Sequence, residues 1–171
     1  MNNTYVVCSL LVAAFLSGCK PAAQEQLEAN KDLVYRFAAA IDAHDWGALD
    51  ALVTSDIRRH SRASGQMSEI TSLGEFKQFE QTLHRSFSDG HVTYEIMIAE
   101  GNMVAAYATF TGVNTGPLGD IEATDKSVQV KFLAMFRIET AKIAEIWVEW
   151  DNVSRLAQLG LLPPPGAQDV D

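Results

Sequence analysis

The sequence predicts an α+β fold, in which helices come first along the chain and antiparallel strands follow. In the first half, apolar residues recur at the spacing of a helix that is buried along one face. From position 91 onward, runs rich in β-branched and aromatic residues alternate with turns that contain Gly or Asn. This order favours a single domain with helices packed on one face of a curved sheet.

Two helices are expected before the first strand. The apolar spacing predicts one amphipathic helix over residues 22–44, which the segment 44–47 ends. Asp45 can then cap a short second helix at 47–53. Residues 55–62 follow as a turn and a short strand with several basic side chains.

A third helix is expected to begin at Ser72, because Ser72 and Glu75 have the spacing of a capping box. The helix ends at residues 88–90. Its apolar stripe consists of Phe76, Phe79, Leu83 and Phe87. An aromatic stripe at this spacing is more typical of a hydrophobic core than of a cofactor site.

The second half of the chain is expected to form four strands and one helix. The strands are predicted at residues 91–100, 103–113, 127–139 and 142–151. The first two form a hairpin across Gly101-Asn102, and the segment 114–126 is a long connection to the third. A tight turn joins the third strand to the fourth, and the final helix ends at Gly160.

The last strand carries the main candidate for chemistry. Its period-two alternation puts five side chains on one face: Ile143, Glu145, Trp147, Glu149 and Asp151. The other face is wholly apolar: Ala144, Ile146, Val148 and Trp150. A carboxylate held among apolar groups loses solvation, which raises its pKa and suits it to general acid or base catalysis. Asp151 is therefore a candidate proton-transfer group. Alternatively, Asp151 or Asn152 caps the final helix, and the two roles are compatible.

A homodimer is expected from the apolar faces of the last two strands. If the helices cover the face that carries Asp151, no helix is left for the opposite face. That face presents Ile146, Val148 and Trp150 together with Val130, Phe132 and Phe136. An exposed apolar surface of this size is unusual on a monomer, and a two-fold contact between two sheets would cover it.

The composition argues against several function classes. The 171-residue chain has a net charge of −9 and no basic stripe, which argues against nucleic acid as a partner. The sequence shows no metal-ligand spacing among its histidines, no serine in a nucleophile elbow and no glycine-rich phosphate loop. Metal-dependent, serine-hydrolase and nucleotide-binding functions are therefore not favoured.

Residues 1–18 are expected to be a signal peptide. The apolar run at 5–16 is too short to span a bilayer, and Leu16-Ser17-Gly18-Cys19 resembles the lipobox of bacterial lipoproteins. The resemblance implies cleavage before Cys19, acylation of Cys19 and a short tether over residues 19–27. Cys8 leaves with the signal, so the processed domain would contain no free thiol. The residue after Cys19 is not Asp, which by analogy implies an anchor on the periplasmic face of the outer membrane.

Six short stretches occur in a fixed order along the chain: GNMVAAY at 101–107, TGVNTGP at 111–117, FRI at 136–138, KIAEIW at 142–147, Asp151 and QLG at 158–160. Together they resemble the SnoaL-like polyketide cyclases, also described as ester cyclases, within the nuclear transport factor 2-like superfamily. The likeness covers residues 28–162 and leaves residues 163–171 as a tail.

The resemblance implies a cone-shaped fold, in which a curved antiparallel sheet wraps around the N-terminal helices and encloses an apolar pocket. It also implies chemistry without a metal or an organic cofactor. In the cyclases of this family, the Asp at the end of the last long strand takes and returns protons in an intramolecular aldol closure, and Asp151 matches that position. The chain departs from the family at Val113-Asn114, where many relatives have Thr-His, and at Ala141, where they have Gly.

The resemblance and the strand alternation together suggest five substrate-binding residues. His60 lies where relatives often carry a pocket-facing His, although a surface position in a basic turn is the alternative. Asn114 stands where the family often has His. Arg137 and Met135 share one face of their strand, and Arg137 could instead form an ion pair with the last strand. Trp147 lies on the carboxylate-bearing face of the last strand and is either a pocket wall or a core residue.

Two functions follow from these expectations, and both stay open. The first is a cyclase or isomerase-type lyase that acts on a small apolar carbonyl compound by cofactor-free acid/base chemistry, with Asp151 as the proton-transfer group. The second is a lipid-anchored module that binds an apolar small molecule and performs no chemistry. The same fold supports both, so the fold does not decide between them.

Overall fold

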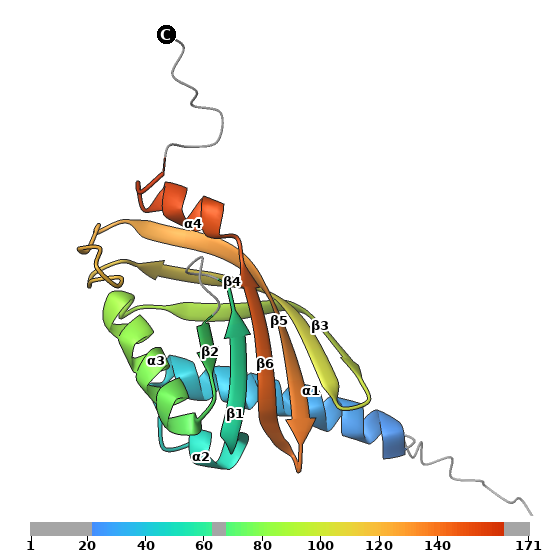
Figure 1. The fold of residues 1–171 in the computed structure, drawn as a ribbon. Coiled ribbons are helices and arrows are strands. Elements are labelled where there is room, and N and C mark those ends of the chain that lie inside the picture. Colours follow the sequence, from blue (N-terminus) through green and yellow to red (C-terminus); the bar gives the residue numbers. More distant parts are fainter. Residues whose placement is uncertain (1–21, 63–67, 163–171) are drawn as a thin grey trace, which may run out of the picture.

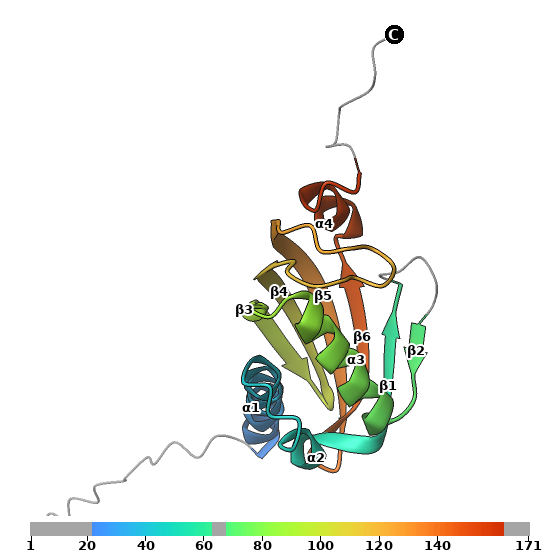
Figure 2. The ribbon, with the colours of Figure 1, turned by 90° about the vertical axis from the view of Figure 1, so that its left-hand side faces the viewer.

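The computed structural model describes residues 22–62 and 68–162 and confirms the predicted α+β fold (Figure 1). The helices are α1 (Ala22–Asp42), α2 (Leu49–Leu52), α3 (Leu73–Ser86) and α4 (Asn152–Gln158). The strands are β1 (Val53–Ser61), β2 (Ser68–Ile70), β3 (His91–Glu100), β4 (Met103–Val113), β5 (Ser127–Glu139) and β6 (Lys142–Trp150). Helices α1 and α3 lie on the same side of one curved sheet, which we call its concave face, and the opposite side is its convex face (Figures 1 and 2).

The helices and strands follow the predicted pattern closely. β3, β4 and β5 have the predicted bounds, and α1 ends just before the predicted break at 44–47. Two features were not expected: β1 begins already at Val53, and the short strand β2 lies at one edge of the sheet. Among the described residues, no helix is both long and apolar enough to cross a bilayer.

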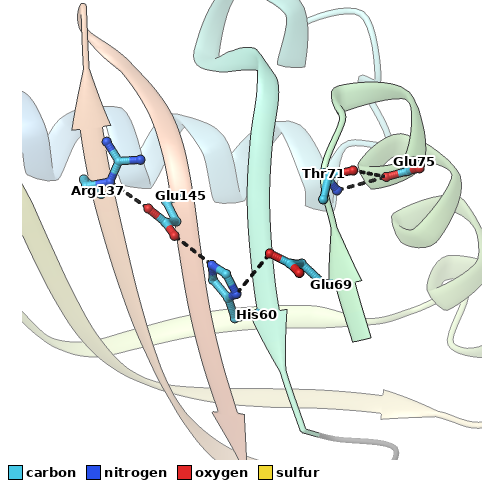
Figure 3. Close-up of polar contacts among 6 residues, drawn as sticks. All are labelled: His60, Glu69, Thr71, Glu75, Arg137 and Glu145. Carbon is cyan, nitrogen blue, oxygen red and sulfur yellow. Dashed lines mark hydrogen bonds and ion pairs between the residues drawn. The ribbon is translucent and has the colours of Figure 1, made fainter. Parts of the chain in front are cut away.

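The predicted capping box at the start of α3 is confirmed. The Ser72 hydroxyl accepts a hydrogen bond from the backbone N–H of Glu75 at 3.3 Å. In return, the Glu75 carboxylate accepts one from the backbone N–H of Thr71 at 2.9 Å (Figure 3). The first bond satisfies a backbone donor that the first turn of a helix leaves free, and the second ties the residue before the N-cap to that turn. Together they fix where α3 begins.

The sheet has the strand order β2-β1-β6-β5-β4-β3. Strands β3 to β6 pair antiparallel in chain order, as predicted. The expected fully antiparallel sheet is corrected at β1, which pairs in parallel with β6 and places Arg59 opposite Ile146 and His60 opposite Trp147. This pairing brings the basic segment of the first half next to the last strand.

The helices cover the apolar face of β6, not the carboxylate-bearing face that we expected them to cover. Ile146, Val148 and Trp150 face the interior on the side of α1 and α3. Burial of apolar surface contributes about 25 cal/mol per Å², whereas the carboxylates of the opposite face would lose hydration if they were buried. The surface that we predicted for a homodimer is therefore covered within one chain.

The predicted alternation on β6 holds only from Glu145 onward. The pairing of β6 with β5 shifts register between Arg137 and Ile138. As a result, Ile143 and Ala144 are both buried, although they are adjacent in sequence. Ile143 thus belongs to the core rather than to the carboxylate-bearing face.

The hydrophobic core lies between α1 and the concave face. Leu33, Val34 and Phe37 of α1 are buried. Alternate side chains of β5 are buried, as predicted: Val128, Val130, Phe132, Ala134, Phe136 and Ile138. The rings of Phe37 and Phe136 meet edge to face, with centroids 6.0 Å apart. This contact packs the middle of α1 onto the middle of the sheet.

Candidate functional site

A cavity of about 110 Å³ lies between α1, α3 and the concave face. Most of its wall is apolar, and much of it is aromatic: Phe37, Ile41, Phe76, Phe79, Leu83, Phe110, Phe132, Phe136, Ile146, Val148 and Trp150. Charged or hydroxyl-bearing side chains reach it from four different elements: Asp42 of α1, Arg59 of β1, Glu80 of α3 and Tyr94 of β3. An apolar cavity with a few convergent polar groups is the usual form of a small-molecule site.

Arg59 is a buried cation in this apolar setting. It shares the concave face of β1 with Ile57, which lies two residues earlier, and only 6% of it is exposed. Its guanidinium carbon lies 4.3 Å from the centroid of the Phe79 ring, which is a cation–π contact. Burial lowers the pKa of Arg59 and the nearby Glu80 raises it, but a guanidinium remains protonated at physiological pH.

Glu80 is a carboxyl group within the apolar stripe of α3. It lies one helical turn from Phe76 and from Leu83, so its side chain is on the face of the helix that packs against the sheet. Burial raises the pKa of Glu80 to about 7, although the positive charge of Arg59 opposes the shift. A carboxyl with this pKa is protonated in about half of the molecules at neutral pH, so it can both donate and accept a proton.

Neither head group has a hydrogen-bond partner among the residues that the structure describes. Among the hydrogen bonds and ion pairs of the described residues, none involves the Arg59 guanidinium or the Glu80 carboxyl. The two groups both line the cavity, and the charge of each shifts the pKa of the other. Buried polar groups in folded proteins normally have partners. This pair is therefore the part of the wall that a bound molecule would engage.

Tyr94 and Asp42 supply the other polar edge of the cavity. Burial raises the pKa of the Tyr94 hydroxyl, and the carboxylates of Asp42 and Glu80 raise it further. The phenol therefore stays protonated and can donate a hydrogen bond. Asp42 is held in place by His91, with 2.8 Å between Asp42 Oδ2 and His91 Nδ1.

A smaller hollow of about 40 Å³ lies beside the cavity and shares Glu80 with it. Its wall includes two histidines, His44 and His84, whose ring centroids are 3.5 Å apart. We call them the histidine pair. Burial lowers the pKa of His84, and the charges of His44 and Arg85 lower it further. The described ranges contain no group of three or more His, Cys, Asp or Glu side chains placed to hold a metal ion.

Asp151, the predicted proton-transfer residue, caps α4. Its Oδ1 accepts a hydrogen bond from the backbone N–H of Ser154 at 3.0 Å. Its side chain is exposed and does not line the cavity. The capping prediction is therefore confirmed. The expectation that the strand points Asp151 into the pocket is wrong, because β6 ends at Trp150 and the chain turns into the helix. A catalytic role of Asp151 stays a prediction.

Three of the predicted binding residues lie together on the convex face, and Figure 3 shows two of them, His60 and Arg137. His60 Nε2 lies 2.7 Å from Glu145 Oε1, and Arg137 Nε donates to Glu145 Oε2 at 2.8 Å. The His60 ring stacks on Trp147, with centroids 5.4 Å apart. The network joins β1, β6 and β5 side by side. It confirms the cross-strand ion pair that was the alternative for Arg137. His60 lies outside the cavity, but in strand β1 and half-buried rather than at the surface of a basic turn.

The two remaining predicted residues do not line the cavity either. Met135 lies on the convex face and is 46% exposed. Asn114 is fully buried, and its amide donates to the carbonyls of Ser86 at 3.2 Å and Gly116 at 2.7 Å. Its side-chain oxygen accepts from the backbone N–H of Thr124 at 2.9 Å. Asn114 thus holds the long connection against the end of α3, and its polar groups are already occupied.

The sequence did contain signals for the two residues that were missed. Glu80 interrupts an aromatic stripe at a position on the same helix face as Phe76. Arg59 lies two residues after the apolar Ile57, so the two share one face of a strand. A charged residue at a buried position of an apolar pattern is itself a sign of a functional site. Their meeting depends on how α3 lies against β1, and no local pattern reveals that.

Comparisons with known proteins identify a family from the sequence and a shared fold from solved structures. The sequence model of the SnoaL-like polyketide cyclases matches residues 31–159. Among solved structures, TsrD from Streptomyces laurentii is 24% identical with a TM-score of 0.70, over 79% of this chain and 97% of that one. IdmH from Streptomyces antibioticus is 23% identical with a TM-score of 0.66, over 77% and 98%. A SnoaL-like polyketide cyclase from Agrobacterium tumefaciens is 18% identical with a TM-score of 0.65, over 77% and 98%. No curated protein matches the sequence.

The solved structures share with this chain the curved α+β fold of the nuclear transport factor 2-like superfamily, as expected. The family match spans most of the chain and includes Asp42, Arg59, Glu80 and Tyr94. The chain therefore belongs to the SnoaL-like polyketide cyclase family.

Proposed function

We propose that this protein performs acid/base chemistry, without a cofactor, on a small apolar carbonyl compound that binds in the cavity. The observation that carries the proposal is Glu80, a carboxyl in an apolar cavity with a pKa of about 7. A general acid or base works best when its pKa lies near the working pH. Membership of the SnoaL-like family supports a reaction of the cyclase or isomerase type.

In the proposed reaction, ionised Glu80 removes a proton from the carbon next to a carbonyl group. The enolate carbon then attacks a second carbonyl of the same molecule and forms a carbon–carbon bond. Protonated Glu80 returns its proton to the new alkoxide, so the ionised carboxylate is regenerated. The Tyr94 hydroxyl, which its raised pKa keeps protonated, donates a hydrogen bond to the enolate oxygen.

The size of the cavity limits the substrate. Pockets for drug-sized ligands occupy roughly 300–1,000 Å³, and a cavity of about 150 Å³ is enough for benzene. A cavity of about 110 Å³ therefore suits a compound of few carbon atoms, or the reacting end of a longer one.

The test does not require the natural substrate. A base that reaches the carbon next to a carbonyl exchanges its protons with D₂O, and NMR can follow this exchange on small ketones such as butanone. We expect the protein to accelerate the exchange, and Glu80→Gln to reduce the rate by about a hundredfold or more. Asp151→Asn is the matched variant, because Asn still caps a helix and removes only the titratable group.

The pair of variants separates the two candidate carboxyls. If Glu80→Gln loses the exchange and Asp151→Asn keeps it, the proton-transfer group is Glu80. The reverse result would assign the role to Asp151, as its family position implies. Exchange with none of a panel of small ketones would contradict the proposed chemistry.

The alternative function is a module that binds an apolar small molecule without chemistry. One observation favours it: Asn114, at the position where many relatives have His, uses its polar groups within the fold. A carrier tends to retain its cargo. Mass spectrometry of the purified domain should then detect a bound apolar compound, whereas an enzyme that releases its product should purify without one.

We also propose that the protein is a lipoprotein anchored through Cys19 on the periplasmic face of the outer membrane. The support is the lipobox-like segment 16–19, which lies outside the described residues. Acyl chains contribute about 0.8 kcal/mol of membrane affinity per buried methylene. Cys19→Ser should therefore yield unprocessed or soluble protein. Recovery of this variant in the membrane fraction as processed protein would contradict the proposal.

We further propose a homodimer, now through the convex face. That face of β3 and β5 exposes four large apolar side chains: Ile96, Ile98, Leu133 and Met135. A second copy of the chain would cover them in a two-fold sheet contact. Leu133→Glu should produce a monomer in light scattering at micromolar concentration, while Ala39→Glu on the exposed side of α1 should not. A monomeric wild-type protein would rule the dimer out.

A further inference from the structure

The cavity contains a buried cation that has no hydrogen-bond acceptor within the described part of the chain. The Arg59 guanidinium carries several N–H donors, and the Phe79 ring covers one of its faces. Glu80 is close enough to interact electrostatically, but it is protonated in part of the molecules and compensates the cation incompletely. A guanidinium of this kind binds a carboxylate well, because its planar shape allows two parallel hydrogen bonds.

The other polar groups of the cavity do not compensate Arg59. Asp42 reaches the cavity from α1, but His91 already pairs with it at 2.8 Å. Burial and the nearby Asp42 and Glu80 raise the pKa of Tyr94, so its hydroxyl stays protonated and carries no charge that could compensate Arg59. The histidine pair lies in the adjacent hollow, beyond Glu80. The end of the cavity at Arg59 is therefore the place where an anionic group gains most.

We propose that the cavity binds a small apolar carboxylic acid as its anion, with the carboxylate paired to the Arg59 guanidinium and hydrogen-bonded by protonated Glu80. The apolar part of the ligand then lies against the aromatic wall, which includes Phe110 and Trp150. This inference rests on the cavity being the functional site of the proposed function, and it adds the class of molecule.

An amine is the main competing ligand, because aromatic walls also attract ammonium groups. Arg59 argues against it. A second cation placed beside a buried guanidinium is repelled strongly where the surroundings screen charge poorly. An amine therefore serves as one arm of the test.

Binding of an anion is coupled to the protonation of Glu80. A negative charge beside Glu80 raises the pKa of its carboxyl further, so the complex takes up a proton when it forms above about pH 7. The affinity for the anion should then fall as the pH rises above the pKa of Glu80 in the free protein, by at most about tenfold per pH unit. Arg59 and Tyr94, which also line the cavity, keep one protonation state over this range. The Glu80→Gln variant removes the titratable group at position 80 and leaves the histidine pair in place, so comparison with the wild type isolates the effect of Glu80.

The experiment compares three ligands of one shape and three charges, namely isobutyrate, isobutyramide and isobutylamine, by NMR titration of the isotope-labelled protein. We expect isobutyrate to bind at least about tenfold more tightly than isobutyramide at neutral pH, and isobutylamine to bind most weakly. The shifted signals should belong to residues of the cavity wall. Equal or tighter binding of the amide or the amine would overturn the proposal.

Two substitutions test the roles of the two residues. Arg59→Met keeps the length of the side chain without its charge and should remove the preference for isobutyrate. Arg58→Met is the matched control, because Arg58 is the exposed neighbour on β1. Arg59→Lys, which keeps the charge but not the planar fork, should bind isobutyrate with intermediate affinity and serves if Arg59→Met does not fold. An unchanged preference in both Arg59 variants would refute the pairing.

Glu80→Gln completes the test. An amide donates a hydrogen bond at every pH, so this variant should bind isobutyrate with an affinity that no longer varies between about pH 6 and pH 9. A pH dependence that survives this change would assign it to another group and contradict the proposal. The outcome is independent of turnover. Selective anion binding without ketone exchange removes the proposed chemistry alone, and exchange without anion selectivity removes this inference alone.

Discussion

Arg59 and His60 are neighbours in sequence, but β1 turns the first toward the cavity and the second toward the convex face. On the convex face, His60 and Arg137 both contact the Glu145 carboxylate, so the charges are paired across three strands. In the cavity, Arg59 and Glu80 have no such bonds among the described residues. The difference separates polar groups that hold the sheet together from polar groups that remain available to a ligand.

The two faces also shift carboxyl pKa values in opposite directions. Burial raises the pKa of Glu80 to about 7. At Glu145, burial acts in the same direction, but hydrogen bonds from His60 and Arg137 outweigh it and lower the pKa. A shifted pKa is also a statement about stability, because the folded and unfolded states then bind protons differently. The comparison can therefore be tested by unfolding experiments, which need no ligand.

The largest expected effect is a loss of stability with rising pH that is caused by Glu80. The folded protein keeps this proton up to about pH 7, while an unperturbed Glu releases it near 4.5. Between these values the native state binds more protons, so the free energy of unfolding falls as the pH rises, by roughly 3 kcal/mol in total. Urea unfolding at several pH values should show this fall in the wild type and not in Glu80→Gln. Parallel pH profiles of the two proteins would mean that the Glu80 carboxyl is solvated.

A smaller effect is expected at the cap of α4. Asp151→Ala removes the acceptor for the Ser154 N–H and should cost about 1 kcal/mol of unfolding free energy. Asp151→Asn keeps an acceptor and should change stability by only a few tenths of a kcal/mol. Urea unfolding of both variants at neutral pH measures the difference. An unchanged free energy of unfolding in Asp151→Ala would show that the hydrogen bond contributes nothing to the stability of the fold.

The smallest effect is expected on the convex face. Glu145→Gln should cost less than about 1 kcal/mol, because pairs that water reaches contribute little. The contribution of Glu145 to the free energy of unfolding changes with pH in the opposite direction to that of Glu80. The lowered pKa of Glu145 means that its contribution is present at neutral pH and is lost as the pH falls through the native value. Isobutyrate binding should be unaffected. A weakened affinity in this variant would show that the polar groups of the convex face also influence binding in the cavity.

The sequence predicted the secondary structure well because each element has a strong local pattern. The bounds of β3, β4 and β5 follow from alternation and turn residues, and the start of α3 follows from Ser72 and Glu75. Strand β2 was missed because three residues are too few to show a period. The parallel contact of β1 with β6 joins distant parts of the chain, and local patterns carry no information about it.

The face of β6 that the helices cover was predicted wrongly for a different reason. Alternation states which residues of β6 share a face, but it does not state which face the helices will cover. The wholly apolar set that includes Ile146 and Val148 should have decided this, since leaving it in water is the less favourable arrangement. The family position drew attention to Asp151 instead. Glu80 was overlooked because an apolar stripe is usually read for its apolar members.

The parallel pairing of β1 with β6 has a consequence for the order of folding. The hairpins from β3 to β6 connect neighbouring segments and can form as soon as those segments exist. Strand β1 must wait for β6, the last strand of the chain, and closing so long a loop is entropically slow. We therefore expect β1 to dock late, after the rest of the sheet. A ribosome-bound chain that lacks β6 would carry Arg59 without its place in the sheet, and the cavity would form only once β6 has been synthesised.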